Sequence, residues 1–262
     1  QNFKKKITVI KEWAGEGNEV QSVRPSNVTI NLENEAKAEL TSANAVEGNA
    51  NQWSKEVEVD KYSKDGKELT YGYVSETSTD ANKFASYTNT GVDTSVADTV
   101  KVTNTYKAPE VTDETFTKDG TTTITSKDDE LTYTISYSST VTDYKGDATL
   151  TIVDKLPYEI DETKSDLNGG TYDAATKTIT WTERITGIDT YANGAKNIEV
   201  SKTIEVVYVG MDVTAGTFKN TAQGTLKFDE TGKEDPTDPA EETTTQNFKK
   251  KITVIKEWAG EG

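Results

Sequence analysis

The sequence predicts an all-β chain that forms two antiparallel β-sandwiches in tandem. Threonine, which favours strands, is the commonest of the 262 residues, and apolar and polar residues alternate with a period of two in both halves. No segment shows a long helical period, and turn sequences such as KDGK, TKDG, NGG and ANGA separate the alternating runs. Strands with one apolar face must pack that face against another sheet, which gives a sandwich.

Seven alternating runs carry this prediction. Those of the first half are ITVIKEW (7–13), ELTYGYV (68–74) and VKVTNTY (100–106). Those of the second half are ELTYTISY (130–137), ATLTIVD (148–154), KTITWTE (177–183) and IEVVYVG (204–210).

Two proline-containing segments divide the chain. KAPEVTD (107–113) follows a strand-like run, and the acidic segment from 233 onward has two prolines and almost no apolar residue, which is typical of an exposed spacer. We therefore predict one domain at residues 1–107 and a second at residues 108–245, with an acidic linker at 233–245. These are called domain one and domain two below.

An exact internal repeat sets the larger organisation. Residues 1–17, QNFKKKITVIKEWAGEG, recur letter for letter at 246–262, a period of 245 residues. This period fits a unit of two ordinary domains, so we interpret residues 246–262 as the first strand of a following repeat. The alternative is a duplication introduced in cloning.

Composition excludes several classes of function. The chain has 45 Asp and Glu against 29 Lys and Arg, a net charge of −16, which argues against nucleic acids and anionic membranes as partners. Without His or Cys there is no disulfide, no His-ligated metal and no Ser-His-Asp or Cys-His nucleophile. No apolar run approaches the ~20 residues of a membrane span. We expect no cofactor and no metal site, because the acidic runs lack the EF-hand pattern and are typical of solvated surface.

Polar residues interrupt the apolar faces of domain one. Side chains at positions i and i+2 share a strand face, so Lys11 falls between Val9 and Trp13 on an apolar face. By the same parity Asn104 faces inward, and Glu76 shares a face with Val74 in the strand before it. A buried Lys or Glu is costly unless it is paired, so three inward polar residues indicate a shared site.

Domain two shows the same order with one change. Lys118 shares a face with Phe116, Asp154 with Ile152, and Asn220 with Phe218. A Lys therefore comes early, an acid in the middle and an Asn late. Lys127 also lies near the expected first strand and is an alternative to Lys118.

These residues carry a family resemblance. ITVIKEW, RPSNVTINL, KYSKDGKELTYGYVSE and VTNTY, in this order over nearly all of residues 5–107, resemble the B-type repeat domain of Gram-positive collagen adhesins and pilins. Domain two, with ELTYTISY, VDKLP, GGTYD, TITWT and FKNTAQG, resembles more loosely the surface-repeat and A-type adhesin domains. The resemblance implies immunoglobulin-like sandwiches.

The resemblance also implies an intramolecular isopeptide bond in each domain. In the family the first-strand Lys joins the last-strand Asn with the help of an acid. Carried over, these roles fall on Lys11, Asn104 and Glu76 in domain one, with Lys256 as the next-repeat equivalent of Lys11. In domain two they fall on Lys118 and Asn220, with Asp154 as the promoting acid.

The residue types suit that chemistry. Burial lowers the pKa of a Lys and raises that of a carboxylic acid, so an amine can attack the Asn amide while the acid stabilises the developing charge. Two alternatives stay open. One is a buried ion pair bonded to Asn with no bond made. The other is an ester between Thr115 or Thr117 and Gln223, although the resembling ester domains rely on a His that this chain lacks.

The predicted function is structural. We expect an extracellular stalk or spacer repeat of a bacterial cell-surface adhesin or fibre, anchored to the cell wall through other regions, and not an enzyme in the sense of turnover. Its expected partners are neighbouring repeats of the same chain. A host matrix protein is a further expected partner, bound through another region of the protein. The alternative functions are a domain that itself binds a host extracellular-matrix protein, and a filament or pilus subunit.

Overall fold

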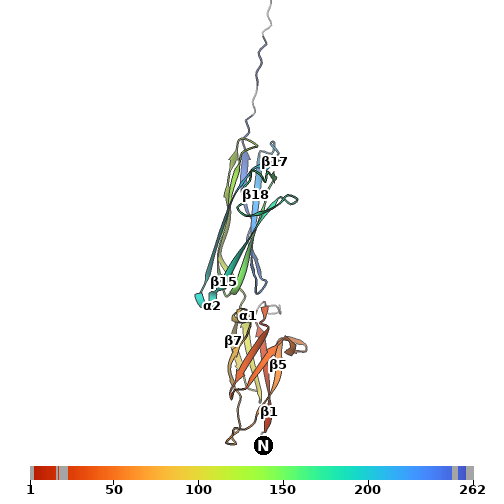
Figure 1. Cartoon of the computed structure of the whole chain (residues 1–262), viewed down its shortest axis with the longest axis vertical. Coiled ribbons are helices and arrows are strands. Elements are labelled where there is room, and N and C mark those ends of the chain that lie inside the picture. The colour runs from red at the N-terminus through yellow and green to blue at the C-terminus, as the bar shows by residue number, and fades with distance from the viewer. Residues whose placement is uncertain (1–2, 16, 18–22, 250–252, 258–262) are drawn as a thin grey trace, which may run out of the picture.

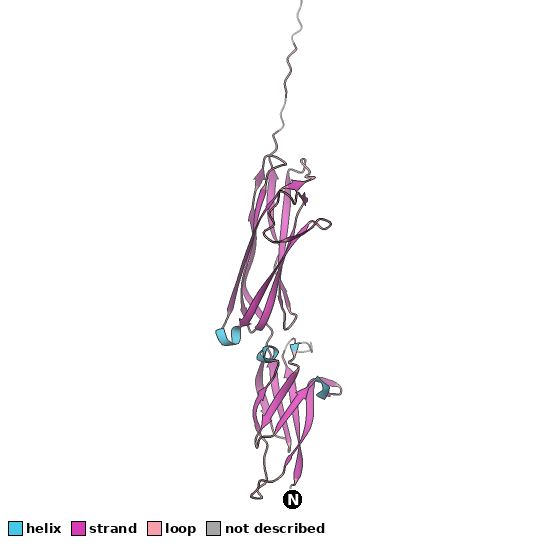
Figure 2. Cartoon of the chain, in the orientation of Figure 1, coloured by secondary structure: helices cyan, strands magenta, loops and turns pink. Residues whose placement is uncertain are grey.

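A computed structural model describes residues 3–15, 17, 23–249 and 253–257. It shows two β-sandwiches that follow one another along the long axis, with the short helices near the junction between them or at the rim of domain one (Figures 1 and 2). The prediction of an all-β chain with two tandem immunoglobulin-like sandwiches is confirmed.

Domain one packs a five-stranded sheet, in the order β4-β5-β1-β8-β7, against a three-stranded sheet, in the order β3-β2-β6. The pairing of β1 with β8 is parallel, a departure from the purely antiparallel expectation. The elements are β1 (Lys4–Ala14), β2 (Asn27–Leu32), β3 (Lys37–Thr41), a 3-10 turn (Ser42–Asn44), β4 (Ala45–Val46), β5 (Asn49–Asp60), β6 (Tyr73–Thr77), α1 (Ala81–Ala85), β7 (Tyr87–Asp93) and β8 (Thr99–Tyr106).

Alternation in the sequence becomes alternation in burial. Every second residue of β8 is buried, and Ile7, Val9 and Trp13 of β1 belong to the core between the two sheets. Parity is wrong for β6, because Val74 is 58% exposed. A register shift opposite Asn31 and Leu32 disrupts the β6 pairing, so residues 74 and 76 do not share an inner face.

Domain two packs a seven-stranded sheet against a three-stranded sheet, β16-β11-β9, with a small two-stranded sheet beside them. The larger sheet has the order β10-β20-β18-β12-β15-β14, with β19 paired to β18. The elements are β9 (Glu110–Gly120), β10 (Thr123–Ile124), β11 (Leu131–Thr142), β12 (Lys145–Lys155), β13 (Glu159–Ile160), β14 (Thr171–Asp173), β15 (Thr178–Asp189), α2 (Thr190–Asn193), β16 (Lys196–Val206), β17 (Tyr208–Val209), β18 (Thr217–Phe228), β19 (Glu234–Pro236) and β20 (Ala240–Gln246).

The segment predicted as an exposed linker at 233–245 is part of the sheet, so that prediction is wrong. β20 pairs antiparallel with β18 and, at its end, parallel with β10. Thr244 is fully buried and donates a 2.7 Å hydrogen bond to the Thr121 carbonyl. Few apolar residues mark this strand, and only its β-branched threonines suit a pleated sheet.

The two domains contact each other around a short connection. Only three residues separate β8 from β9, and the Lys107 amine lies 2.7 Å from both carboxylate oxygens of Asp143. Asn82 of α1 donates to Glu230 across the same junction at 3.3 Å. These two contacts join the facing ends of the two sandwiches.

Beyond β20 the chain leaves domain two as an extended trace (Figure 1). Val254 and Ile255 are 86% and 80% exposed, whereas Val9, which is the equivalent of Val254, is fully buried. The sequence of β1 thus lies here without the neighbouring strands β5 and β8. That residues 246–262 begin another repeat stays a prediction, and residues 250–252 and 258–262 lie outside the described part of the chain.

Candidate functional site

The core of domain one contains a Lys and an Asn from neighbouring strands. The parallel register sets Asn104 of β8 opposite Trp13 of β1, so Lys11 lies two positions away on the same inner face. Both Lys11 and Asn104 are fully buried. Diagonal neighbours on one sheet face are within reach of a long side chain such as Lys.

Glu76 completes this cluster from the opposite sheet. Its Oε2 lies 2.8 Å from the Lys11 Nζ, and its side chain is 7% exposed. Glu76 pairs with the buried Ile30 of β2, which directs it toward the five-stranded sheet. The acid therefore meets the amine across the sandwich core, as the sequence predicted for these two residues.

Burial controls the charge of the amine. It lowers the pKa of Lys11 to about 8, although the Glu76 carboxylate acts in the opposite direction. The Nζ also lies 5.0 Å from the ring centroid of Trp13, which in turn packs edge-on against Trp53 and Tyr87. A neutral amine is therefore accessible near physiological pH, because little water is present to stabilise the ammonium form.

Asn104 is the unusual member of the cluster. Neither its Oδ1 nor its Nδ2 has a hydrogen-bond partner, although both atoms are buried. Leaving one buried polar group unpaired costs about 1–3 kcal/mol, so such groups are rare in folded proteins. An amide without hydrogen bonds beside an amine and an acid is suited to reaction with them.

Domain two builds a similar cluster from different strands. The Lys118 Nζ, on β9, lies 2.6 Å from Asp154 Oδ1, on β12, and both side chains are fully buried. Asn220 of β18 donates to Asp154 Oδ2 at 3.3 Å, while its own Oδ1 is buried without a partner. The three predicted residues are thus brought together.

The charges in domain two follow the same physical rule. Burial lowers the pKa of Lys118 and raises the pKa of Asp154, against their mutual attraction. Lys118 also lies 5.0 Å from the ring centroid of Tyr133. Burial therefore shifts the pair toward amine plus protonated acid, a state that supplies both a nucleophile and a hydrogen-bond donor.

The two clusters differ in which sheets they join. In domain one the Lys and the Asn share a sheet and the acid comes from the other sheet. In domain two Asp154 and Asn220 lie on paired strands, and Lys118 comes from the opposite sheet. A Lys–Asn bond would therefore join neighbouring strands in domain one and the two sheets in domain two.

The aromatic rings beside the amines were not predicted as part of the sites. Trp13 could have been found, because it lies two residues after Lys11 on the same strand face. Tyr133 lies on β11, and no spacing in the sequence relates it to Lys118. Only the pairing of β9 with β11 brings them together.

The residues of the alternative crosslinks lie outside the two buried clusters. Lys127 is 67% exposed and pairs with its neighbour Asp128, so it is not part of the buried cluster. Thr115, Thr117 and Gln223 are exposed, and Gln223 donates to the Thr237 carbonyl, which gives no support to an ester. Lys256 lies on the exposed trace beyond domain two, away from the clusters.

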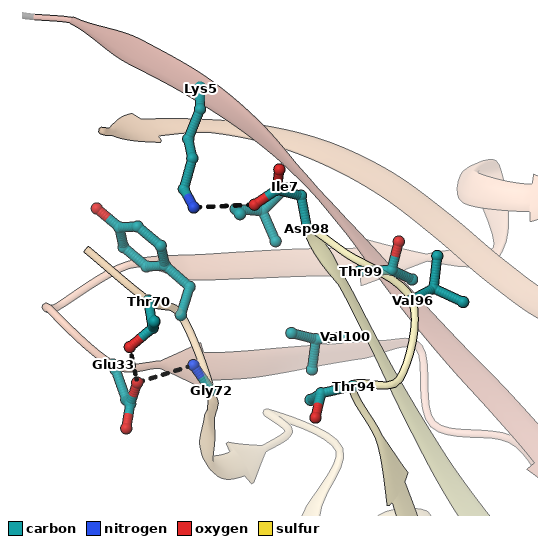
Figure 3. Close-up of a pocket in the computed structure, with 11 residues that line it drawn as sticks. Lys5, Ile7, Glu33, Thr70, Gly72, Thr94, Val96, Asp98, Thr99 and Val100 are labelled. Atoms are coloured by element: carbon teal, nitrogen blue, oxygen red, sulfur yellow. Dashed lines mark hydrogen bonds and ion pairs between the residues drawn. The ribbon is translucent and has the colours of Figure 1, made fainter. Parts of the chain in front are cut away.

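Metal clusters and membrane-spanning helices are absent from the described residues. No group of three or more His, Cys, Asp or Glu side chains there could hold a metal ion. No helix in that part of the chain is long and apolar enough to cross a membrane. A pocket of about 310 Å³ opens at the end of domain one that lies away from domain two, and Lys5, Asp98 and Glu33 line it (Figure 3).

Three solved structures resemble the chain weakly. The first is the major pilin SpaD from Corynebacterium diphtheriae, which is 14% identical over 92% of this chain and 66% of that chain, with a TM-score of 0.31. The second is the major pilin subunit BcpA from Bacillus cereus carrying the substitution D312A, which is 12% identical over 92% of this chain and 69% of that chain, with a TM-score of 0.30. The third is a single B repeat unit of the collagen-binding surface protein of Staphylococcus aureus, which is 16% identical over 93% of this chain and 100% of that chain, with a TM-score of 0.28. The chain spans just under two thirds of the SpaD pilin. All three TM-scores lie below 0.5.

The family comparison is specific to domain one. No curated protein matches the chain. Residues 7–105 match the Cna protein B-type domain, a range that contains Lys11, Glu76 and Asn104. The match to the Cna protein B-type domain therefore covers nearly all of domain one.

Proposed function

We propose that the chain is a stalk segment of a bacterial cell-surface adhesin or pilus, in which each sandwich is closed by an autocatalytic Lys–Asn isopeptide bond. The observation that carries this proposal is the repeated core cluster. Two different sandwiches each bury one Lys, one acid and one Asn whose amide is wholly or partly without hydrogen bonds. A stalk that only needs packing has no use for such groups in two cores.

The reaction conserves atoms without a co-reactant. The neutral Lys11 amine attacks the Asn104 side-chain carbonyl carbon, and protonated Glu76 donates a hydrogen bond to the oxygen. The carbon–nitrogen bond to Nδ2 then breaks, the acid relays a proton from the attacking to the leaving nitrogen, and ammonia departs. Folding supplies the rate, since effective molarities of about 10⁵–10⁸ M have been reached by well-oriented groups. Lys118, Asp154 and Asn220 perform the same steps in domain two.

The bonds suit a load-bearing role outside the cell. A covalent bridge inside each sandwich resists pulling along the chain, and an amide is not broken by the thiols that reduce disulfides. The chain has no Cys, so a staple of this kind takes the place that a disulfide takes in other extracellular proteins. In this proposal the immediate partners are neighbouring repeats, and a host matrix protein binds elsewhere.

Intact mass tests the chemistry. We expect the purified chain to be lighter than its sequence by two ammonias, with Lys11→Ala and Lys118→Ala each restoring one. Lys127→Ala is the matched control and should restore none, because that side chain is exposed. Peptide mapping should recover residues around Lys11 and Asn104 as one branched peptide. A chain without any deficit would leave two buried ion pairs and overturn the proposal.

Binding of a host ligand by this segment itself is tested separately. Saturable binding of the chain to immobilised matrix proteins would show that it is more than a spacer. The stalk proposal expects no saturable signal.

A further inference from the structure

We propose that residues 246–248 form a rigid joint between successive repeats, in which domain two of one repeat docks onto domain one of the next and Phe248 is held between them. This inference rests on the proposed tandem arrangement. It goes further in naming the docking surfaces at both ends of the repeat. The partner is a second copy of domain one.

The exit side of the joint is ordered by domain two. The Gln246 N–H donates to the Gly216 carbonyl and the Asn247 N–H donates to the Ile124 carbonyl, both at 2.8 Å. Phe248 is half-buried and packs against the hydrophobic core of domain two. The chain is therefore fixed to domain two as far as Phe248, two residues beyond the end of β20.

The entry side is ordered by domain one. Phe3, the equivalent of Phe248, accepts a 2.8 Å hydrogen bond at its carbonyl from the Lys61 N–H. Its ring packs edge-on against Tyr62 at a centroid distance of 5.9 Å, yet 54% of Phe3 is exposed. The next residue, Lys4, begins β1.

In a continuous array one phenylalanine makes both sets of contacts. Because residues 246–262 repeat 1–17, Lys249 is the equivalent of Lys4 and would begin β1 of the next repeat. Only Asn247 and Phe248 then separate the two strands, which limits the separation of the flanking Cα atoms to about 10 Å. Two sandwiches joined over this distance must touch at their ends.

The end surfaces that meet carry exposed apolar residues. Val213, 52% exposed, lies in the loop before β18 that ends at Gly216, which holds Gln246. On domain one, Val96 is 63% exposed and, like Lys5, lines the pocket shown in Figure 3. We assign the loop at residues 210–216 of the preceding repeat as the cover of this end of domain one. Burial of both valines would favour that contact.

The test uses the chain extended beyond residue 262 by a second copy of residues 18–107, so that the repeated segment can complete a domain. Residual dipolar couplings are measured for domain two and for the added domain. If the joint is rigid, domain two and the added domain should share one common alignment tensor. A flexible Gly-Ser insert between Phe248 and Lys249 should separate the tensors, whereas the same insert at the open turn of Gly66 should not.

Point substitutions locate the contact. Phe248→Ala and Val213→Ala should each allow the two domains to align differently. Phe3→Ala and Val92→Ala are the controls, because Phe3 of the test protein lies outside the joint that is measured and Val92 of β7 lies level with Lys11, away from the entry end. Controls that separate the tensors as strongly as Val213→Ala would contradict the assigned surface.

The outcomes for the joint and for the stalk are distinguishable on one sample. Independent alignment of the domains without any insert, together with the ammonia deficit, would overturn the joint and leave the stapled stalk. A common tensor without a deficit would keep the joint and overturn the isopeptide mechanism.

Discussion

Lys11 and Asn104 lie on parallel neighbouring strands, two register positions apart on one inner face. The parallel direction matters because both strands run from the entry end of domain one toward domain two. A bond between these residues would connect the strand on which tension enters with the strand on which it leaves. Residues 12–103 would then carry no load.

Glu76→Gln should abolish the bond in domain one and leave domain two unchanged. Gln cannot relay a proton, so the intact mass should show one missing ammonia instead of two. A cross-link that closes a loop of this size is worth about 4–5 kcal/mol of unfolding free energy in the chain-entropy model. Chemical denaturation should therefore show domain one weakened by about that amount. Two missing ammonias in this variant would remove Glu76 from the mechanism.

Asn104→Ala should leave Lys11 with a free amine, so that the stability of domain one depends on pH through this group. The folded-state pKa of Lys11 is about 8 against 10.5 for the free side chain, so the unfolded state binds more protons between these values. Stability should rise with pH through this window, by at most about 1.4 kcal/mol per pH unit for one proton. Denaturation at several pH values measures this. The double variant Asn104→Ala with Lys11→Met should lose this rise of the unfolding free energy with pH. If the double variant kept the same slope against pH, a buried titrating amine at Lys11 would be contradicted.

Pulling on the chain should extend domain two by one short step and domain one not at all. The staple at Asn220 precedes most of β18 and all of β19 and β20, so residues 221–246 lie outside it. β20 is held to β18 by hydrogen bonds and not by a covalent bridge, so it can be drawn off the sheet. Single-molecule force spectroscopy should show a step of about 90 Å from these residues. A step that corresponds to the whole of domain two would mean that its staple is absent.

Gly15→Ala should destabilise domain one more than Gly48→Ala. Both glycines have positive φ, so both substitutions cost backbone strain. A Cβ on Gly15 would lie 2.6 Å from the Tyr106 carbonyl oxygen, whereas a Cβ on Gly48 would meet nothing within 4 Å. We expect a difference of about 1–3 kcal/mol, as for other small-to-large changes in packed sites. Equal midpoints in thermal unfolding would contradict the close approach of β1 to β8.

The polar residues at the two sites show which side-chain directions can be predicted from alternation alone. Parity alone predicts that Lys11, Asn104, Lys118, Asp154 and Asn220 point inward, and all five are buried. Parity is wrong at Val74, because the pairing of β6 with β2 contains a register shift at this position, which alternation along one strand cannot predict. The acidic segment at 233–245 was missed as a strand because its few buried side chains are threonines, which give no apolar signal.

The sequence by itself determined the all-β class, the exact repeat and which residue types enter each core, because side-chain direction in a strand depends only on position along it. Its motifs also carry the resemblance to the B-type repeat domain, whose family model matches residues 7–105. Only the tertiary structure decided that β1 and β8 are parallel neighbours, that Lys118 rather than Lys127 meets Asp154, and that Asn104 has no hydrogen-bond partner. These facts depend on which strands pair and which sheets face each other, and such contacts join residues far apart in the chain.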